Sequence, residues 1–286
     1  MRRARLGGAA QWPHDDELAG PVSRGTPLAG ARVLITGGTR GIGRLMAQDA
    51  VRRGAEVVLW ARDAAQGERV SAELGARASF QAVDVSDPEA VRATAEVTGP
   101  VDVLINNAGV VTGKPFLELT EDEVRRTYEV NTLAQYRVTR AFLPAMLARD
   151  RGHLVHVASA SGLLGTTRMT DYSGSKHAVV GFNEALRAEL RAQRSNVRTL
   201  VVCPFFIDTG MFAGVSTRLP WLLPILKEAD VATRVLDAVE SGRPQLLLPW
   251  SVRLLPVLRA LPVRAFDQVV DLLGVNHTMD RFNGRR

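Results

Sequence analysis

The chain has 286 residues, of which 46% are hydrophobic and 23% charged, and its formal net charge is +6. This composition is typical of a folded globular protein and excludes a disordered or fibrous chain. The single cysteine excludes an intrachain disulfide and a cysteine-based metal site, and the basic residues form no stripe interleaved with aromatic residues, so we expect no nucleic-acid partner.

Short apolar strands alternate with helices along most of the chain. Strands are predicted at 32–36, 56–60, 78–83, 101–105, 153–158, 197–203 and 245–248, and helices at 42–53, 88–97, 121–148 and 172–192. Strands that are apolar throughout are buried on both faces, and alternation with short connections predicts right-handed crossovers. We therefore expect a single-domain α/β fold, a doubly wound (Rossmann) parallel sheet of about seven strands flanked by helices.

The rhythm of strands and helices changes at both ends of the chain. Residues 1–29 are rich in Gly, Ala, Pro and charge, which predicts a flexible N-terminal tail. From about residue 211 the sequence is rich in Leu, Pro and Trp. We expect residues 30–213 to form a dinucleotide-binding and catalytic core, and residues 214–286 to form a substrate-binding lobe with a C-terminal extension.

A glycine-rich turn, TGGTRGIG at residues 36–43, follows the first strand and opens a helix. In this context glycines let a pyrophosphate approach the backbone, and the helix N-terminus supplies free N–H groups. A purely structural tight turn is the alternative. The candidate cofactor-binding residues of this turn are Gly37, Thr39, Arg40, Gly41, Ile42 and Gly43.

Two arginines bear on which dinucleotide binds. Sites selective for NAD usually place an acidic side chain after the second strand, where this chain has Arg62; Asp63 comes one place later. Arg62 and Arg40 suit a 2′-phosphate, which a guanidinium can bind through two hydrogen bonds. The alternative is a pair of solvated arginines. We expect a preference for NADP(H), with NAD(H) as the alternative cofactor.

Polar residues that could take part in catalysis or binding follow the later strands. Tyr172 and Lys176 lie four residues apart on one helix face, where the lysine can lower the tyrosine pKa. Ser159 ends the fifth strand, and a strand-end cap is its alternative role, with Ser161 as the nearby competitor. Asn107, Ala108 and Gly109 end the fourth strand, where small residues let a cofactor pass, and Asn131 is an unfavourable residue within a helix.

These motifs, in this order and spacing, resemble those of the short-chain dehydrogenase/reductase family over roughly residues 30–213. The resemblance implies a catalytic tetrad, with Tyr172 as general acid/base and Ser159 polarising the substrate oxygen. Lys176 would lower the tyrosine pKa and hold the nicotinamide ribose, and Asn131 would support a water-linked proton relay. Asp84 matches the position that contacts the adenine. The further cofactor-binding residues are Val85, Asn107, Ala108, Gly109, Tyr172 and Lys176.

A second resemblance concerns the loop after the sixth strand. The family commonly has Pro-Gly there, whereas this chain has Pro204 followed by Phe205, which puts the path of the loop in doubt; Ile207 and Thr209 still match cofactor-binding positions. This string, and residues 248–250 and 279–285, resemble the branch of retinol and hydroxysteroid dehydrogenases. The resemblance implies a role in lipid metabolism and a homodimer or homotetramer.

The resulting hypothesis is an NADP(H)-dependent oxidoreductase that interconverts a lipophilic alcohol (retinoid, steroid or long-chain) with its aldehyde or ketone. The alternatives are a reductase of small or acyl-thioester ketones and a non-catalytic dinucleotide sensor. Five scattered histidines predict no metal. No signal peptide or membrane-spanning run is found, which predicts a cytoplasmic protein. Residues 246–273 fit a packed lobe, a dimer contact or a peripheral membrane contact.

Overall fold

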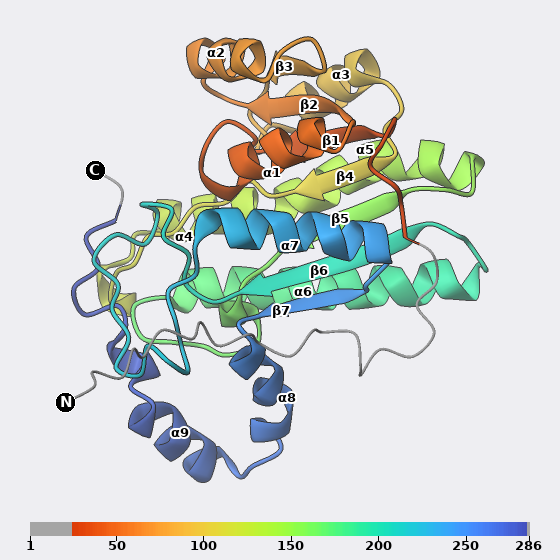
Figure 1. The fold of residues 1–286 in the computed structure, drawn as a ribbon. Coiled ribbons are helices and arrows are strands. Elements are labelled where there is room, and N and C mark those ends of the chain that lie inside the picture. Colours follow the sequence, from red (N-terminus) through yellow and green to blue (C-terminus); the bar gives the residue numbers. More distant parts are fainter. Residues whose placement is uncertain (1–24, 285–286) are drawn as a thin grey trace, which may run out of the picture.

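A seven-stranded parallel sheet lies at the centre of the computed structural model, which describes residues 25–284 (Figure 1). The strand order is β3-β2-β1-β4-β5-β6-β7, so the chain runs outward from β1 in one direction and returns to β4 to continue in the other. This is the doubly wound arrangement that the sequence predicts. The strands are β1 (Arg32–Thr36), β2 (Glu56–Ala61), β3 (Ala78–Ala82), β4 (Val103–Asn106), β5 (His153–Val157), β6 (Arg198–Pro204) and β7 (Gln245–Leu248).

Helices cover both faces of the sheet and bury two separate apolar clusters. One face is covered by α1 (Gly41–Arg52), α2 (Ala64–Leu74) and α7 (Glu228–Ser241). The other is covered by α3 (Pro88–Thr98), α5 (Ala134–Ala148) and α6 (Thr170–Ala192). Shorter helices are α4 (Glu121–Tyr128), α8 (Leu255–Leu258) and α9 (Val263–Leu272).

The structure differs from the sequence prediction in two groups of helices. Helices α2, α7, α8 and α9 were not predicted: α2 buries only Gly67 and Val70, so its apolar pattern is weak, and the other three fall within the stretch that we expected to be a lobe. The single helix predicted over residues 121–148 is instead α4 and α5, joined by a π-helical turn at Glu129–Leu133. Such turns insert an extra residue into a helix and often occur at functional sites.

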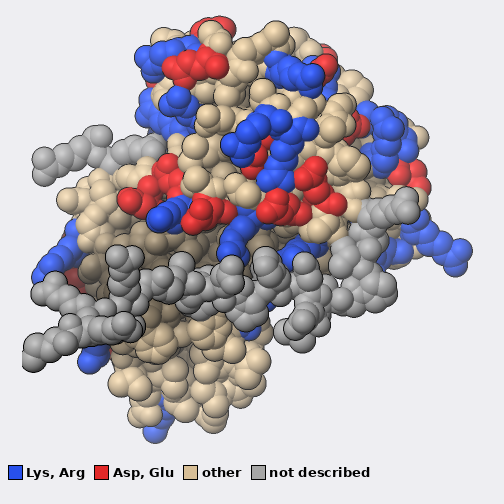
Figure 2. Space-filling view, in the orientation of Figure 1, with Lys and Arg blue, Asp and Glu red and all other residues tan. Residues whose placement is uncertain are grey.

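The C-terminal part of the chain is divided between the sheet layers and an outlying helix pair. Helix α7 packs against α1, and β7 pairs with β6, so residues 228–248 belong to the layered core. Helices α8 and α9 project beyond β7 (Figure 1). The region where they lie shows few charged side chains on the face in view in Figure 2. Within the described residues, no helix combines the length and apolarity needed to cross a membrane.

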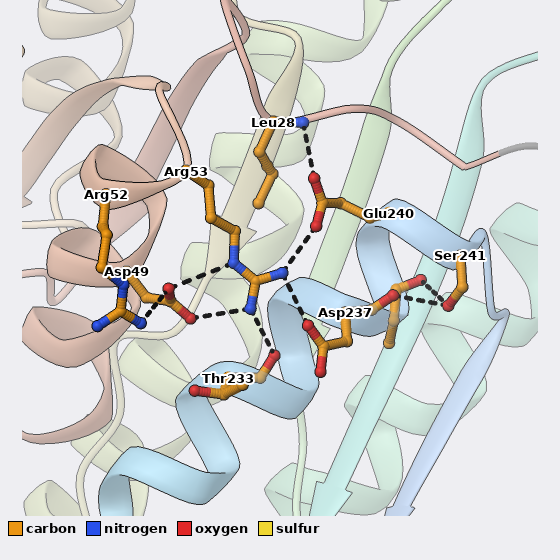
Figure 3. Close-up of polar contacts among 9 residues, drawn as sticks. Leu28, Asp49, Arg52, Arg53, Thr233, Asp237, Glu240 and Ser241 are labelled. Carbon is orange, nitrogen blue, oxygen red and sulfur yellow. Dashed lines mark hydrogen bonds and ion pairs between the residues drawn. The ribbon is translucent and has the colours of Figure 1, made fainter. Parts of the chain in front are cut away.

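The predicted flexible tail falls largely outside the described residues, but residues 25–29 are packed. Leu28 is fully buried, and its backbone N–H donates a hydrogen bond to Glu240 Oε1 at 3.2 Å (Figure 3). The backbone N–H of Thr26 donates to the Val239 carbonyl at 3.1 Å. These residues run along α7 and lead into β1.

An ion-pair network joins α1 to α7 around Arg53, which is only 19% exposed (Figure 3). Arg53 Nη2 lies 3.0 Å from Asp49 Oδ2, and Nη1 lies 2.7 Å from both Asp237 Oδ1 and Glu240 Oε2. Burial opposes the ionisation of Asp49, but hydrogen bonds from Arg53 and Arg52 outweigh burial and lower its pKa. The network therefore fixes α7 against the helix that follows the glycine-rich turn.

Replacing Arg53 by Ala is expected to lower the free energy of unfolding by about 2–4 kcal/mol, because Asp49 would remain buried without its main partner. Denaturant titration at pH 7 measures the loss. Arg92 is the control, since it pairs only with Glu89 and Glu96 on an exposed helix face. Arg92→Ala should leave the midpoint unchanged. Equal midpoint shifts in the two variants would show that the Arg53 network stabilises the fold no more than an exposed ion pair does.

The loss of unfolding free energy caused by Arg53→Ala should also depend on pH. Because the pKa of Asp49 in the folded protein lies below the ordinary 3.8, its ionised form stabilises the fold above that value. This contribution is lost as the pH falls through the folded pKa, so the difference in stability should shrink in acid.

Candidate active site

The carboxyl ends of the central strands open into a cleft of about 560 Å³. Nearly all predicted site residues line it, which fits the rule that ligands bind beyond the carboxyl ends of strands in doubly wound sheets. Two are set back from the cleft wall, Gly43 and Asn131. The predicted residues in the cleft are Gly37, Thr39, Arg40, Gly41, Ile42, Arg62, Asp84, Val85, Asn107, Ala108, Gly109, Ser159, Tyr172, Lys176, Pro204, Ile207 and Thr209.

Gly43 allows the glycine-rich turn to pack against the end of β4. A Cβ atom at this position would lie 2.3 Å from the Gly37 carbonyl oxygen and 2.6 Å from Asn107 Nδ2. Asn107 in turn donates hydrogen bonds from Nδ2 to the carbonyls of Thr36 and Gly37, at 3.0 and 3.2 Å. Two strand ends are thereby joined into one cleft wall.

The start of α1 fits an anionic group. Arg40 is the N-cap residue, and its side chain makes no capping hydrogen bond, so the N–H groups of the first turn remain available. Gly37 and Gly41 have no side chains that could fill the space in front of these N–H groups. The donors, the positive end of the helix dipole and the adjoining cleft suit the pyrophosphate of a dinucleotide.

Two basic side chains stand at the far end of the cleft, each near a carboxylate. Arg40 Nη2 lies 3.0 Å from Asp63 Oδ2, and its Nε donates a short hydrogen bond to Gln66. Arg62 Nη1 lies 3.9 Å from Asp84 Oδ2. All four charged side chains are about half exposed, so these pairs are weak and can exchange for a ligand phosphate.

The reactive end of the cleft brings together Ser159, Tyr172 and Lys176. All three are buried and line the same cleft, where the Ser159 hydroxyl donates to the Pro204 carbonyl at 3.5 Å and lies near enough to the Tyr172 phenol to lower its pKa. Lys176 Nζ lies 5.6 Å from the centre of the Tyr172 ring and donates a hydrogen bond to the Val157 carbonyl at 2.9 Å. Ser161, the competitor of Ser159, instead donates its backbone N–H to Ser159 Oγ at 3.1 Å and thus orients that hydroxyl.

Asn131 lies behind this site, in the π-helical turn between α4 and α5, and is fully buried. Its Oδ1 accepts from the Val110 N–H at 2.8 Å, and its Nδ2 donates to the Val110 carbonyl at 2.9 Å and to Ser175 Oγ at 3.1 Å. Ser175 Oγ donates to the Tyr172 carbonyl at 2.7 Å. Asn131 therefore links the loop after β4 to the helix that carries Tyr172 and Lys176.

Burial moves the two titratable groups of the site in opposite directions. It raises the pKa of Tyr172 to about 12, against the opposing hydrogen bond with Ser159. It lowers the pKa of Lys176 to about 8. At neutral pH the phenol therefore keeps its proton and the lysine is largely charged, so Tyr172 holds a proton that it could donate, although its raised pKa makes it a weak acid until further positive charge lies nearby.

A second, apolar cavity of about 80 Å³ adjoins the cleft and shares Ser159, Phe205 and Phe212 with it. Phe205 stands where the family commonly has glycine, and the structure removes the doubt about this loop. Its φ is not positive, and its N–H donates to the Leu248 carbonyl at 2.7 Å. A phenylalanine is accommodated because the backbone continues the path of β6, and its ring becomes a wall of both cavities.

The sequence left some parts of the site unidentified. The sequence could not show that the Val157 carbonyl accepts a hydrogen bond from Lys176, because every residue has such a backbone carbonyl. Phe212 was not singled out from the sequence, yet its ring stands edge-on to Tyr172, with centroids 5.9 Å apart and an interplanar angle of 84°. The only sequence signal for that contact is the run of apolar residues Phe205, Phe206, Met211 and Phe212 just after β6.

Comparison with other sequences identifies close relatives. The sequence model of the family described as short chain dehydrogenase matches residues 31–219. Mouse epidermal retinol dehydrogenase 2 is 39% identical over 271 residues, covering 91% of this chain and 87% of the relative. Human short-chain dehydrogenase/reductase 3 is 36% identical (90% and 88% covered), and mouse estradiol 17-beta-dehydrogenase 11 is 38% identical (85% and 83% covered).

Comparison with solved structures gives the same fold. A short chain dehydrogenase/reductase from Burkholderia phymatum, solved in complex with NAD, superposes with a TM-score of 0.74 at 28% identity, covering 82% of this chain and 94% of that one. A short-chain dehydrogenase from Streptomyces avermitilis gives a TM-score of 0.71 at 27% identity, with 86% and 97% covered.

Proposed function

The chain belongs to the short chain dehydrogenase family, in the branch of its retinol and estradiol dehydrogenase relatives, and we propose that it interconverts a lipophilic alcohol and its aldehyde or ketone. The observation that carries this proposal is the meeting of Ser159, Tyr172 and Lys176 where the cleft adjoins an apolar cavity. A non-catalytic dinucleotide sensor would have no need of a buried phenol beside a buried ammonium.

The chain's own residues divide the work of the reaction. When bound, the nicotinamide cofactor supplies or accepts the hydride. Tyr172 donates a proton to the carbonyl oxygen during reduction and takes it back during oxidation, while the Ser159 hydroxyl stabilises the charge that develops on that oxygen. The charge of Lys176 favours the phenolate form of Tyr172, and Asn131 holds the helix that carries both.

The apolar cavity supports a lipophilic substrate. Its lining is mostly Leu, Val and Phe side chains from the loop after β6, α8 and α9. Pockets of this composition bind apolar molecules and orient them through a few polar groups, a part that Ser159 can play. Because 80 Å³ is well below the roughly 300–1,000 Å³ of pockets for larger ligands, a retinoid or steroid requires the lobe to move outward.

Replacing Tyr172 by Phe is expected to lower kcat/KM by about a hundred- to ten-thousandfold, because the proton donor is lost. NADPH binding should change less than about twofold, since the ring remains. Turnover is followed by NADPH absorbance with retinal, a steroid ketone and aldehydes of increasing length. Tyr136→Phe, which removes a hydroxyl from an exposed tyrosine, should behave as the unchanged protein. Equal activity of Tyr172→Phe would rule out this mechanism, and activity confined to small or thioester ketones would favour the alternative substrate class.

We further propose NADP(H) as the preferred cofactor, with NAD(H) as the weaker one. Arg40 and Arg62 line the cleft beside the ends of β1 and β2, whereas Tyr172 reaches it from α6. Each forms an exposed ion pair, Arg40 with Asp63 and Arg62 with Asp84, and Arg40 also donates a hydrogen bond to Gln66. A 2′-phosphate carries more charge than a single carboxylate and accepts two hydrogen bonds from one guanidinium, which supports exchange of partners.

Replacing Arg40 or Arg62 by Gln is expected to raise the KM for NADPH roughly 10- to 100-fold, the effect of losing a hydrogen bond to a charged group. The KM for NADH should stay within about twofold, because NADH has no 2′-phosphate. Steady-state kinetics with both cofactors measure the change. Arg69→Gln, on the exposed side of α2, is the control. Equal losses with NADH and NADPH would contradict the assignment.

We also propose that the region of α8 contacts a phospholipid surface. Val257 and Val263 are 71 and 74% exposed, and Leu254, which also lines the apolar cavity, is 46% exposed. The outer face of α9 carries Arg264, Asp267 and other polar residues, which limits the contact to the tip around α8. Such an arrangement suits shallow insertion into the headgroup region.

Leu254→Asp and Val257→Asp are expected to reduce binding to phosphatidylcholine vesicles several-fold, because burying a carboxylate in the interface opposes insertion. Co-sedimentation measures the bound fraction. Val97→Asp is the matched control, since Val97 is a 77% exposed valine on α3, at the other end of the sheet. A bound fraction that is the same in all four proteins would contradict the contact.

A further inference from the structure

The C-terminal segment Val275–Gly284 is bound to two loops that border the active site. The Ser216 N–H donates to the Thr278 carbonyl at 3.3 Å, and the Asn283 N–H donates to the Ala213 carbonyl at 3.1 Å. On the other side, Arg168 Nη1 donates to the carbonyls of Met279 and Asp280, at 3.4 and 3.3 Å. The segment therefore connects the loop after β6 to the loop before α6, which carries Tyr172.

Two glycines show how closely this segment packs. A Cβ atom at Gly113 would lie 2.1 Å from the Phe282 ring, and one at Gly214 would lie 2.0 Å from the Arg281 carbonyl oxygen. Both glycines also have positive φ, of +73° and +85°. Side chains at either position would displace the segment, so its docked position depends on the absence of these side chains.

The apolar side chains of the segment reach the wall of the active site. Met279 is fully buried in a cluster with Tyr172 and Phe206, and Phe282 packs against the same cluster. Phe282 lies 6.5 Å from Phe212, measured between ring centroids. Phe212 is in turn 5.9 Å from Tyr172 and 5.1 Å from Phe206.

Phe212 is the ring on which these contacts converge. It lines both the cofactor cleft and the apolar cavity, and it stands edge-on to the ring of Tyr172. Its position therefore decides how much room a substrate has next to Ser159. Phe282 packs against the cluster that contains Phe212 but lines neither the cleft nor the apolar cavity, so it supports Phe212 from outside both.

We infer that Phe282 is a positioning residue that sets the size of the substrate cavity by holding Phe212 against Tyr172, a role that rests on the proposed function. The segment Val275–Gly284 supplies the rigid support through its backbone hydrogen bonds. Loss of the Phe282 ring frees space behind Phe212 and favours bulkier substrates. The effect passes through apolar contacts alone, so the proton chemistry of Tyr172 stays unchanged.

The test compares Phe282→Ala, Phe282→Leu and Phe80→Ala in the full chain. Phe80 is also a half-buried phenylalanine, but it lies on β3 at the far end of the sheet. For Phe282→Ala, the ratio of kcat/KM for a long-chain or cyclic substrate to that for a short aldehyde should rise roughly tenfold, the usual scale for a small change in an apolar pocket. Phe282→Leu and Phe80→Ala should stay within about twofold of the unchanged protein.

Hydrogen exchange gives a second measurement that does not depend on activity. Amides of residues 206–216 should exchange faster in Phe282→Ala than in Phe80→Ala, because the loop loses its support. An unchanged ratio with unchanged exchange would overturn the inference, as would equal effects of Phe80→Ala and Phe282→Ala. If the unchanged protein turns over no alcohol or carbonyl, the proposed function fails instead, and the exchange result still decides whether Phe282 supports this loop.

Discussion

A charged lysine held inside the protein next to a tyrosine is the constraint on which the rest of the site depends. Lys176 is 3% exposed, and its ammonium group makes a hydrogen bond with the Val157 carbonyl rather than an ion pair. Keeping a charge in such a place is unfavourable, as its lowered pKa shows. The surroundings must therefore be rigid enough to hold Lys176 and Tyr172 together, and helix α6 supplies the spacing while β5 supplies the acceptor.

Several features of the fold hold the surroundings of Lys176 and Tyr172 in place. The π-helical turn at Glu129–Leu133 brings Asn131 to a position where it links Val110 with Ser175 beneath α6. The close packing of Gly43 against Gly37 joins the ends of β1 and β4 into one wall. The network around Arg53 fixes α7 against α1. Together they place the cofactor cleft and the reactive groups in a single frame.

The sequence predicted the sheet well because its strands are short apolar runs with clear glycine-rich or polar endings. The spacing of Tyr172 and Lys176 predicted one helix face, and the position of Ser159 at a strand end predicted its place in the cleft. The sequence could not reveal contacts made by backbone atoms, such as the Val157 carbonyl. Nor could it reveal α7 as a core helix, because membership in the core depends on packing against α1, far away in the chain.

The Tyr172–Lys176 pair can be tested directly by titrating the phenol. The chain has three tyrosines, so NMR of protein with ¹³C at the tyrosine ζ position can follow each one. We predict that in the free protein the pKa of Tyr172 lies above the ordinary value, near 12, and that it falls toward neutrality when NADP⁺ is bound, but only if Lys176 is present. A Tyr172 pKa at the ordinary value, or an equal fall in Lys176→Met, would contradict the account.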